Sequence, residues 1–111
     1  EITGFYHTLT ESEKNTVSEK VIAQLKKVSN ALSSAKYNLI VLDEVIDLID
    51  LNIISEEFLV KLLSNSGNTE LILTGHKPYD KIIDISDYYT YFYCKKHPYN
   101  KGIKGRKGIE Y

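Results

Sequence analysis

The chain has 111 residues and a mass of 12.7 kDa, with 42% hydrophobic and 26% charged residues, the composition of one small globular domain. Its formal charge of −1 supplies no overall field to attract nucleic acid or an anionic membrane, and its apolar runs are too short to span a bilayer. A single cysteine, Cys94, cannot form an internal disulfide, which favours a reducing compartment and predicts a cytoplasmic location.

The first predicted helix follows a short mixed segment, residues 1–8, that is typical of a strand end running into a loop. Thr10 and Glu13 have the spacing of a capping box, in which each side chain accepts a hydrogen bond from an otherwise unpaired backbone N–H. The next apolar residues recur every three or four positions, as on one helical face: Val17, Val21, Leu25, Val28 and Leu32. This pattern predicts a helix that ends near Ser34.

Two short apolar runs predict β-strands. Residues 37–42 form the first run, which ends abruptly in Asp43 and Glu44 and indicates a central strand buried on both faces. Residues 69–74 form the second run, which is closed by Gly75.

Helices are predicted between and after these strands. Residues 45–51 are apolar with interspersed aspartates, which favours one or two helical turns. Ser55 precedes two glutamates, as expected for a capped start with acidic residues at the positive end of the helix dipole. Pro78 is suited to open a further short helix that runs to Ile83.

Residues 88–95 predict a third strand, because they are dense in aromatic and β-branched side chains. The order strand, helix, strand, helix, strand implies parallel pairing with right-handed crossovers. We therefore predict an α/β fold with a mainly parallel sheet. From His97 onward, glycines recur every three residues among basic side chains, which indicates an extended tail that needs a surface to lie against.

The strongest local sign of function is the pair Asp43 and Glu44 at the end of an apolar strand. Ligands of open parallel sheets bind beyond the carboxyl ends of the strands, where a carboxylate holds Mg²⁺ beside the phosphates of a nucleotide. This is the Walker B arrangement, and its alternative is a solvated acidic pair at a strand-to-helix turn. No Gly-x-x-x-x-Gly-Lys-Ser/Thr phosphate loop occurs in the sequence, which therefore holds half of a nucleotide site.

Six short motifs follow one another along the whole chain. They are Thr3-Gly4-Phe5, Leu39-Ile40-Val41-Leu42-Asp43-Glu44, Leu73-Thr74-Gly75, Lys96-His97-Pro98-Tyr99, Gly102-Ile103-Lys104 and Lys107-Gly108-Ile109-Glu110-Tyr111. Together they resemble the ATP:corrinoid adenosyltransferases of cobalamin synthesis or salvage. The resemblance implies a three-layer, RecA-like P-loop fold and an enzyme that moves the 5′-deoxyadenosyl group of ATP onto the cobalt of a reduced corrinoid, releasing triphosphate.

The resemblance also implies how much of the enzyme is present. In that family the P-loop lies upstream of the Thr-Gly-Phe motif, so residues 1–111 are expected to be the C-terminal part of a single adenosyltransferase domain. We expect this part alone to be an inactive fragment, because most phosphate contacts come from the P-loop and its helix N-terminus. The alternative from another class is a non-catalytic nucleotide-fold remnant or dimerisation module. A homodimer, formed by self-association or by a domain swap, is expected, since a fragment that lacks its first strands would expose an apolar sheet edge.

Residues at the Mg²⁺ and nucleotide site follow from the same resemblance. Glu44, with Asp43 beside it, matches the acid of the Mg²⁺ site. Thr74 and Gly75 match the start of a Thr-Gly-Arg motif, in which His76 replaces the arginine. A histidine substitutes for a phosphate-binding arginine only when it is protonated.

The resemblance assigns two further residues to the corrinoid. Phe5 matches an aromatic side chain near the lower corrinoid face, where it would exclude water and a competing axial ligand; the alternative is simple packing at a strand end. His7 replaces the family's usual tryptophan and is either a cobalt ligand or an inert surface histidine.

Three other features carry weaker hypotheses. The basic tail and the alternating Tyr89, Tyr91 and Tyr93 would suit an RNA backbone and stacked bases, but period-two tyrosines most often line a half-buried sheet face, and no nucleic-acid partner is expected. His97 lacks a second histidine or cysteine at ligand spacing, which favours a structural or solvent-facing role. Cys94 is expected to be a small core residue.

Overall fold

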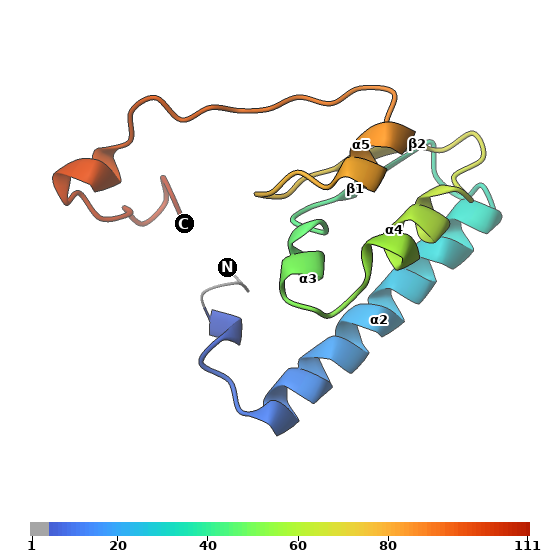
Figure 1. The fold of residues 1–111 in the computed structure, drawn as a ribbon, viewed down its shortest axis with the longest axis horizontal. Helices are drawn as coiled ribbons and strands as arrows, with labels where there is room; N and C mark the ends of the chain where they lie inside the picture. Colours follow the sequence, from blue (N-terminus) through green and yellow to red (C-terminus); the bar gives the residue numbers. More distant parts are fainter. Residues whose placement is uncertain (1–4) are drawn as a thin grey trace.

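The computed structural model describes residues 5–111, so that residues 1–4, and with them most of the Thr3-Gly4-Phe5 motif, lie outside the described part. In chain order its elements are α2 (Glu11–Ser33), β1 (Leu39–Leu42), α3 (Asp47–Asp50), α4 (Glu56–Leu63), β2 (Glu70–Leu73), α5 (Asp80–Ile85) and the 3₁₀ helix η1 (Pro98–Lys101) (Figure 1). None of the helices in this part is both long enough and apolar enough to cross a membrane.

Helix α2 begins with the predicted capping box. The Thr10 hydroxyl accepts a hydrogen bond from the Glu13 backbone N–H at 3.3 Å, and the Glu13 carboxylate accepts one from the Thr10 N–H at 2.8 Å. These bonds from Thr10 hold the pKa of Glu13 below its usual value. The predicted apolar face is confirmed, because Leu25 and Leu32 are buried in the core.

Strands β1 and β2 form a parallel pair, as predicted, with Leu39 opposite Glu70 and Leu42 opposite Leu73. Helices α3 and α4 lie in the connection between them. The mixed α/β class is therefore confirmed, although the sheet of the described residues has two strands rather than three.

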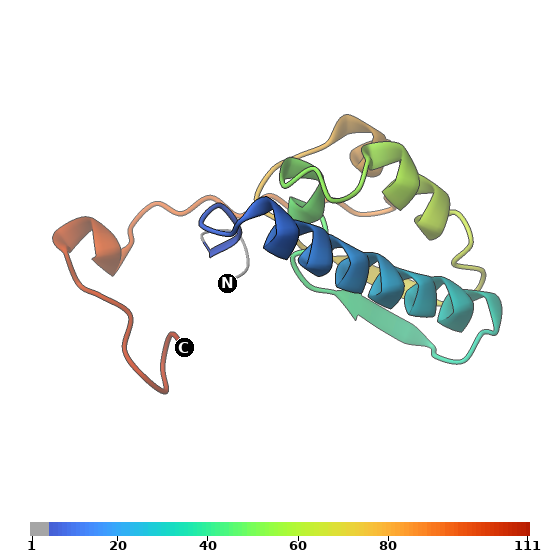
Figure 2. The same ribbon diagram turned by 90° about the horizontal axis from the view of Figure 1, so that it is seen from below.

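The hydrophobic core lies on one face of this sheet. Leu42 of β1, Leu59 of α4 and Ile82 of α5 belong to it, and Leu59 is completely buried. Helices α2 and α4 run side by side in both views of the fold (Figures 1 and 2). The prediction that the first strand is buried on both faces is wrong, because Leu39 and Val41 point away from the core and are 51% and 55% exposed.

The third predicted strand does not form. Residues 88–95 leave the body as an unpaired extended segment that leads into the tail (Figures 1 and 2). Tyr89, Tyr91 and Tyr93 are 49%, 69% and 77% exposed and therefore line no sheet face. Cys94, expected in the core, is exposed as well. Strand propensity is insufficient here, because a strand also needs a neighbouring backbone edge to hydrogen-bond.

The start of the chain also differs from the prediction. Phe5 and Tyr6 lie in a helical turn rather than at a strand end. Tyr6 is buried in the core, and its hydroxyl lies 3.4 Å from the Ser18 hydroxyl of α2. Packing of this aromatic ring against α2 therefore sets the local conformation.

The shorter helices follow the predicted boundaries closely. Ser55 caps α4 by accepting a hydrogen bond from the Phe58 N–H at 3.0 Å. Helix α5 begins two residues after the predicted start at Pro78, and the Lys81 backbone N–H of its first turn donates to the Glu56 carboxylate at 2.9 Å. This bond joins α5 to the start of α4.

Candidate functional site

The candidate site lies where the carboxyl ends of β1 and β2 meet. The Thr74 hydroxyl, just after β2, donates to the Asp43 carboxylate at 2.7 Å and accepts from the Glu44 backbone N–H at 2.8 Å. The Ile46 N–H donates to the Thr74 carbonyl at 3.3 Å. Parallel pairing therefore brings Asp43, Glu44 and Thr74 to one edge, as the sequence predicts.

Glu44 lies at a sharp turn between β1 and α3. Its φ is +55°, in the left-handed region that residues other than glycine rarely adopt. The bond from its N–H to Thr74 helps to hold this turn, and its side chain is only partly exposed.

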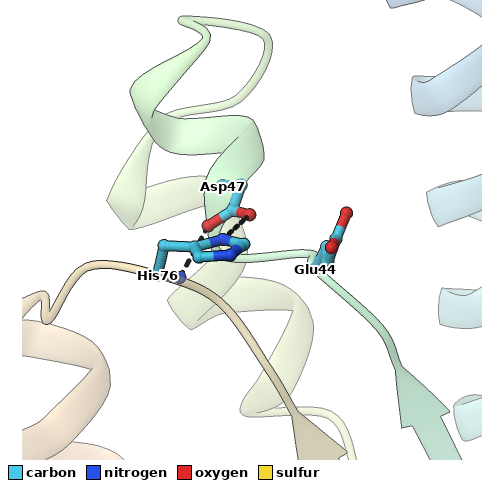
Figure 3. Close-up of side chains that lie close together, drawn as sticks. All are labelled: Glu44, Asp47 and His76. Atoms are coloured by element: carbon cyan, nitrogen blue, oxygen red, sulfur yellow. Dashed lines mark hydrogen bonds and ion pairs between the residues drawn. The ribbon is translucent and has the colours of Figure 1, made fainter. Parts of the chain in front are cut away.

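Asp47 and His76 form the second half of the site, and Asp47 belongs to the first turn of α3 (Figure 3). The Asp47 carboxylate accepts a hydrogen bond from the His76 backbone N–H at 2.8 Å, and its other oxygen lies 2.6 Å from His76 Nδ1. Asp47 is only 4% exposed, whereas the His76 side chain is 71% exposed. The buried carboxylate therefore orients an imidazole that solvent can reach.

Gly75 lets these two segments approach each other. A Cβ at this position would lie 2.5 Å from the Ile46 Cβ and 3.2 Å from an Asp47 carboxylate oxygen. Because real Cβ atoms do not come this close to another carbon, a side chain would push the segment after β2 away from α3. Glycine thus permits the contact between His76 and Asp47.

Three side chains at this edge bring ligand atoms together. Atoms of Glu44, Asp47 and His76 that are able to bind a metal all lie within 4.8 Å of one another (Figure 3). Within residues 5–111, no lysine or arginine forms an ion pair with these two acids or with Asp43. The donor chemistry, two carboxylates beside one imidazole, fits a divalent cation.

The expected corrinoid residues lie elsewhere in the described part. Phe5 is 69% exposed and lines a hollow of about 450 Å³, together with Tyr6, Leu9 and Val17 at the start of α2. His7 is exposed in the adjoining turn, with its ring edge-on to Tyr6. The backbone hydrogen bonds of this turn are local, and the contact of Phe5 and His7 with a corrinoid stays a prediction.

The tail also stays apart from the acidic edge. Its hydrogen bonds in the described residues remain within the tail, as where Arg106 binds the Glu110 carboxylate at 2.9 Å and lowers its pKa. His97 has the expected structural role, because its Nδ1 accepts a hydrogen bond from the Tyr99 N–H and caps η1. The surface that the tail was expected to lie against is not formed by the described residues, as Ile103, Ile109 and Tyr111 are all exposed.

Sequence reasoning missed Asp47 as a site residue. Its only signal is an acid in an apolar run, two residues after a buried valine and at the start of a helix. Such acids commonly cap helices or face solvent, and the sequence cannot reveal a partner 29 positions away.

Comparison with known proteins identifies the family. Residues 1–111 match the family of ATP:corrinoid adenosyltransferases BtuR/CobO/CobP. The chain therefore belongs to this family, which confirms the resemblance found in the sequence and implies a P-loop-like fold.

Two curated relatives match most of the chain. An uncharacterized protein of Nostoc sp., all2391, is 31% identical over 83 residues, which are 73% of this chain and 22% of that protein. A protein of Sinorhizobium sp. named corrinoid adenosyltransferase is 25% identical over 88 residues, which are 78% of this chain and 41% of that protein. The chain thus spans less than half the length of either relative.

Proposed function

We propose that this chain takes part in the transfer of the 5′-deoxyadenosyl group of ATP to the cobalt of a reduced corrinoid. Membership of the adenosyltransferase family over the whole chain supports this function. The structural observation that carries it is the acidic edge, where Thr74 joins the ends of both strands to Asp43 and Glu44. This is the edge at which parallel α/β sheets bind nucleotides.

In the proposed reaction, reduced cobalt attacks C5′ of ATP, so that a cobalt–carbon bond forms as the C5′–oxygen bond breaks. The electron pair of the broken bond leaves with triphosphate. Glu44 and Asp43 would hold the predicted Mg²⁺, which neutralises phosphate charge. Thr74 keeps both acids in place, Gly75 leaves room for the turn, and the exposed imidazole of His76 faces the same edge.

The remaining phosphate contacts are proposed to come from a P-loop segment that precedes these residues in the full enzyme. The 111 residues contain no such loop, and they span 41% of the relative that is named corrinoid adenosyltransferase. Phe5 and His7 are proposed to meet the corrinoid from the start of α2, where Phe5 presents an exposed apolar ring.

Reading the coding DNA upstream of Glu1 tests this proposal. A Gly-x-x-x-x-Gly-Lys-Thr motif within about 80–100 codons, the span of a strand, the loop, a helix and a second strand, supports the enzyme. An in-frame stop there contradicts it and favours the non-catalytic module.

The activity itself is tested by ATP-dependent alkylation of cob(I)alamin, followed by its visible spectrum. The 111 residues alone are expected to show no turnover, and the longer product that carries the P-loop is expected to be active. Glu44→Gln should lower that activity at least about tenfold, because it removes the negative charge of a carboxylate ligand. Glu19→Gln, on the exposed face of α2, should leave the activity unchanged. A P-loop-containing product without transfer activity contradicts the proposed function.

Self-association is the second part of the proposal. Leu39, Val41 and Ile72 expose apolar side chains on the open sheet face, and within residues 5–111 each of the two strands has an unpaired edge. Exposed edges and apolar patches of this kind favour pairing with another chain. Sedimentation should reveal dimers of the 111-residue chain, and a monomer at high concentration would count against them.

A further inference from the structure

The ligand set at the acidic edge differs in kind from an all-oxygen Mg²⁺ site. It combines the carboxylates of Glu44 and Asp47 with the imidazole of His76. Mg²⁺ prefers six oxygen ligands and keeps several of its waters, whereas imidazole nitrogen suits iron, nickel, copper and zinc. The histidine is therefore the residue that sets this group apart from an all-oxygen set.

The geometry of the three side chains is already close to that of a bound ion. They come from three separate places, the turn after β1, the first turn of α3 and the segment after β2 (Figure 3). Ligands about 2.0–2.2 Å from one ion lie roughly 3–4 Å from one another. Because the ligand atoms are at most 4.8 Å apart, side-chain adjustments of about an ångström are enough to close the site.

Asp47 organises this arrangement. It is almost fully buried, and both of its oxygens bind His76, one through the backbone N–H and one through the ring. Each carboxylate oxygen has a second lone pair, so these bonds do not exhaust its capacity as a ligand. A carboxylate–histidine pair of this kind sets the ring orientation at metal sites.

The charge at the edge also favours a cation. Asp43, Glu44 and Asp47 place three carboxylates between the end of β1 and the first turn of α3, and of these three Asp47 is hydrogen-bonded to His76. Lys77, which follows His76 in the sequence, instead binds Asp50 at 2.9 Å.

We propose that Glu44, Asp47 and His76 bind one divalent transition-metal ion, of the cobalt or zinc class, which would take the place of the Mg²⁺ that the proposed function assigns to Glu44 and Asp43. The open coordination positions are left to water or to a phosphate oxygen. The placement of the ion beside a polyphosphate rests on the proposed function, whereas the metal preference rests on these three side chains alone.

The test uses the 111-residue chain without ATP or corrinoid. Co²⁺ is titrated while its visible absorption is followed, and Zn²⁺ and Mg²⁺ are measured by equilibrium dialysis. One Co²⁺ per chain should bind at least about tenfold more tightly than Mg²⁺. His76→Gln and Glu44→Gln should each weaken Co²⁺ binding at least about tenfold, as expected when a metal ligand is lost.

Matched controls separate a built site from general attraction to histidines or acids. His97→Gln in the tail and Glu19→Gln on α2 should leave Co²⁺ affinity within about twofold of the unchanged chain. His76→Arg introduces a permanent cation and removes the imidazole, and it should also lose Co²⁺ binding. Circular dichroism of every variant checks that the fold is retained.

Three results would overturn the inference: equal affinity for Co²⁺ and Mg²⁺, unchanged Co²⁺ affinity in folded His76→Gln, or an equal loss in His97→Gln. Because no ATP or corrinoid is present, any of these results leaves the adenosyl-transfer proposal standing. Conversely, loss of adenosyl transfer in the longer product would leave the metal preference intact.

Discussion

Gly75→Ala tests the close contact on which the acidic edge depends. The new Cβ would lie 2.5 Å from the Ile46 Cβ, more than an ångström inside the usual carbon–carbon separation of about 3.5–4.0 Å. To relieve this overlap, the segment after β2 must move away from α3. That movement stretches the bonds from Ile46 N–H to Thr74 and from His76 N–H to Asp47.

The magnitude follows from these contacts. Overpacking of this kind costs about 1–3 kcal/mol, and weakening the two hydrogen bonds adds about 1 kcal/mol. Replacing glycine by alanine also restricts the unfolded chain, which returns about 0.4–1 kcal/mol. We therefore expect a net loss of about 2–3 kcal/mol in the free energy of unfolding.

Urea unfolding followed by circular dichroism measures this loss. With a slope of about 1–3 kcal/mol per molar urea, the midpoint should fall by about 1–2 M. Gly105→Ala is the matched control, because its Cβ would meet the Tyr111 ring at an ordinary 3.4 Å, and its effect should stay within about 0.5 kcal/mol.

A double-mutant cycle assigns the cost to one neighbour. Ile46 is the N-cap residue of α3, a position where glycine is tolerated, and Ile46→Gly removes the atom in conflict. In that background Gly75→Ala should cost about 1–2 kcal/mol less. The reasoning is refuted if Gly75→Ala is as stable as the unchanged chain, or if its cost is the same in both backgrounds.

Three further predictions concern single side chains. Thr74→Val should lower stability by about 1–2 kcal/mol in urea unfolding, because the Glu44 N–H loses its partner, and Thr74→Ser should restore most of it. Thr10→Ala should cost about 1 kcal/mol and reduce α2 helicity by circular dichroism; an unchanged helix would contradict the capping role. The hydrogen bond that Tyr79 donates to Asp50 raises the pKa of Tyr79 to about 12. This bond therefore contributes its full share to the free energy of unfolding below about pH 10, the pKa of an unfolded tyrosine, and the contribution is lost as the pH rises through about 12. The stability difference from Tyr79→Phe should therefore narrow between pH 10 and 12, and a constant difference would refute this linkage.

Local sequence determined the elements whose stabilising contacts are close along the chain. The capping box of Thr10 and Glu13 and the cap at Ser55 each join residues three positions apart. The alternation of strands and helices also predicted that β1 and β2 pair in parallel, which places Asp43 and Glu44 beside Thr74. Family membership follows from motifs spread over the chain.

The tertiary structure decided the features that depend on distant partners. The bond between Asp47 and His76 spans 29 positions and exists only because Gly75 lets two segments approach. Residues 88–95 have a strong preference for strand but leave the body of the fold and pair with neither β1 nor β2, so they remain unpaired. A cap needs only its own turn of helix, whereas a strand or a buried carboxylate needs a partner that folding must bring to it.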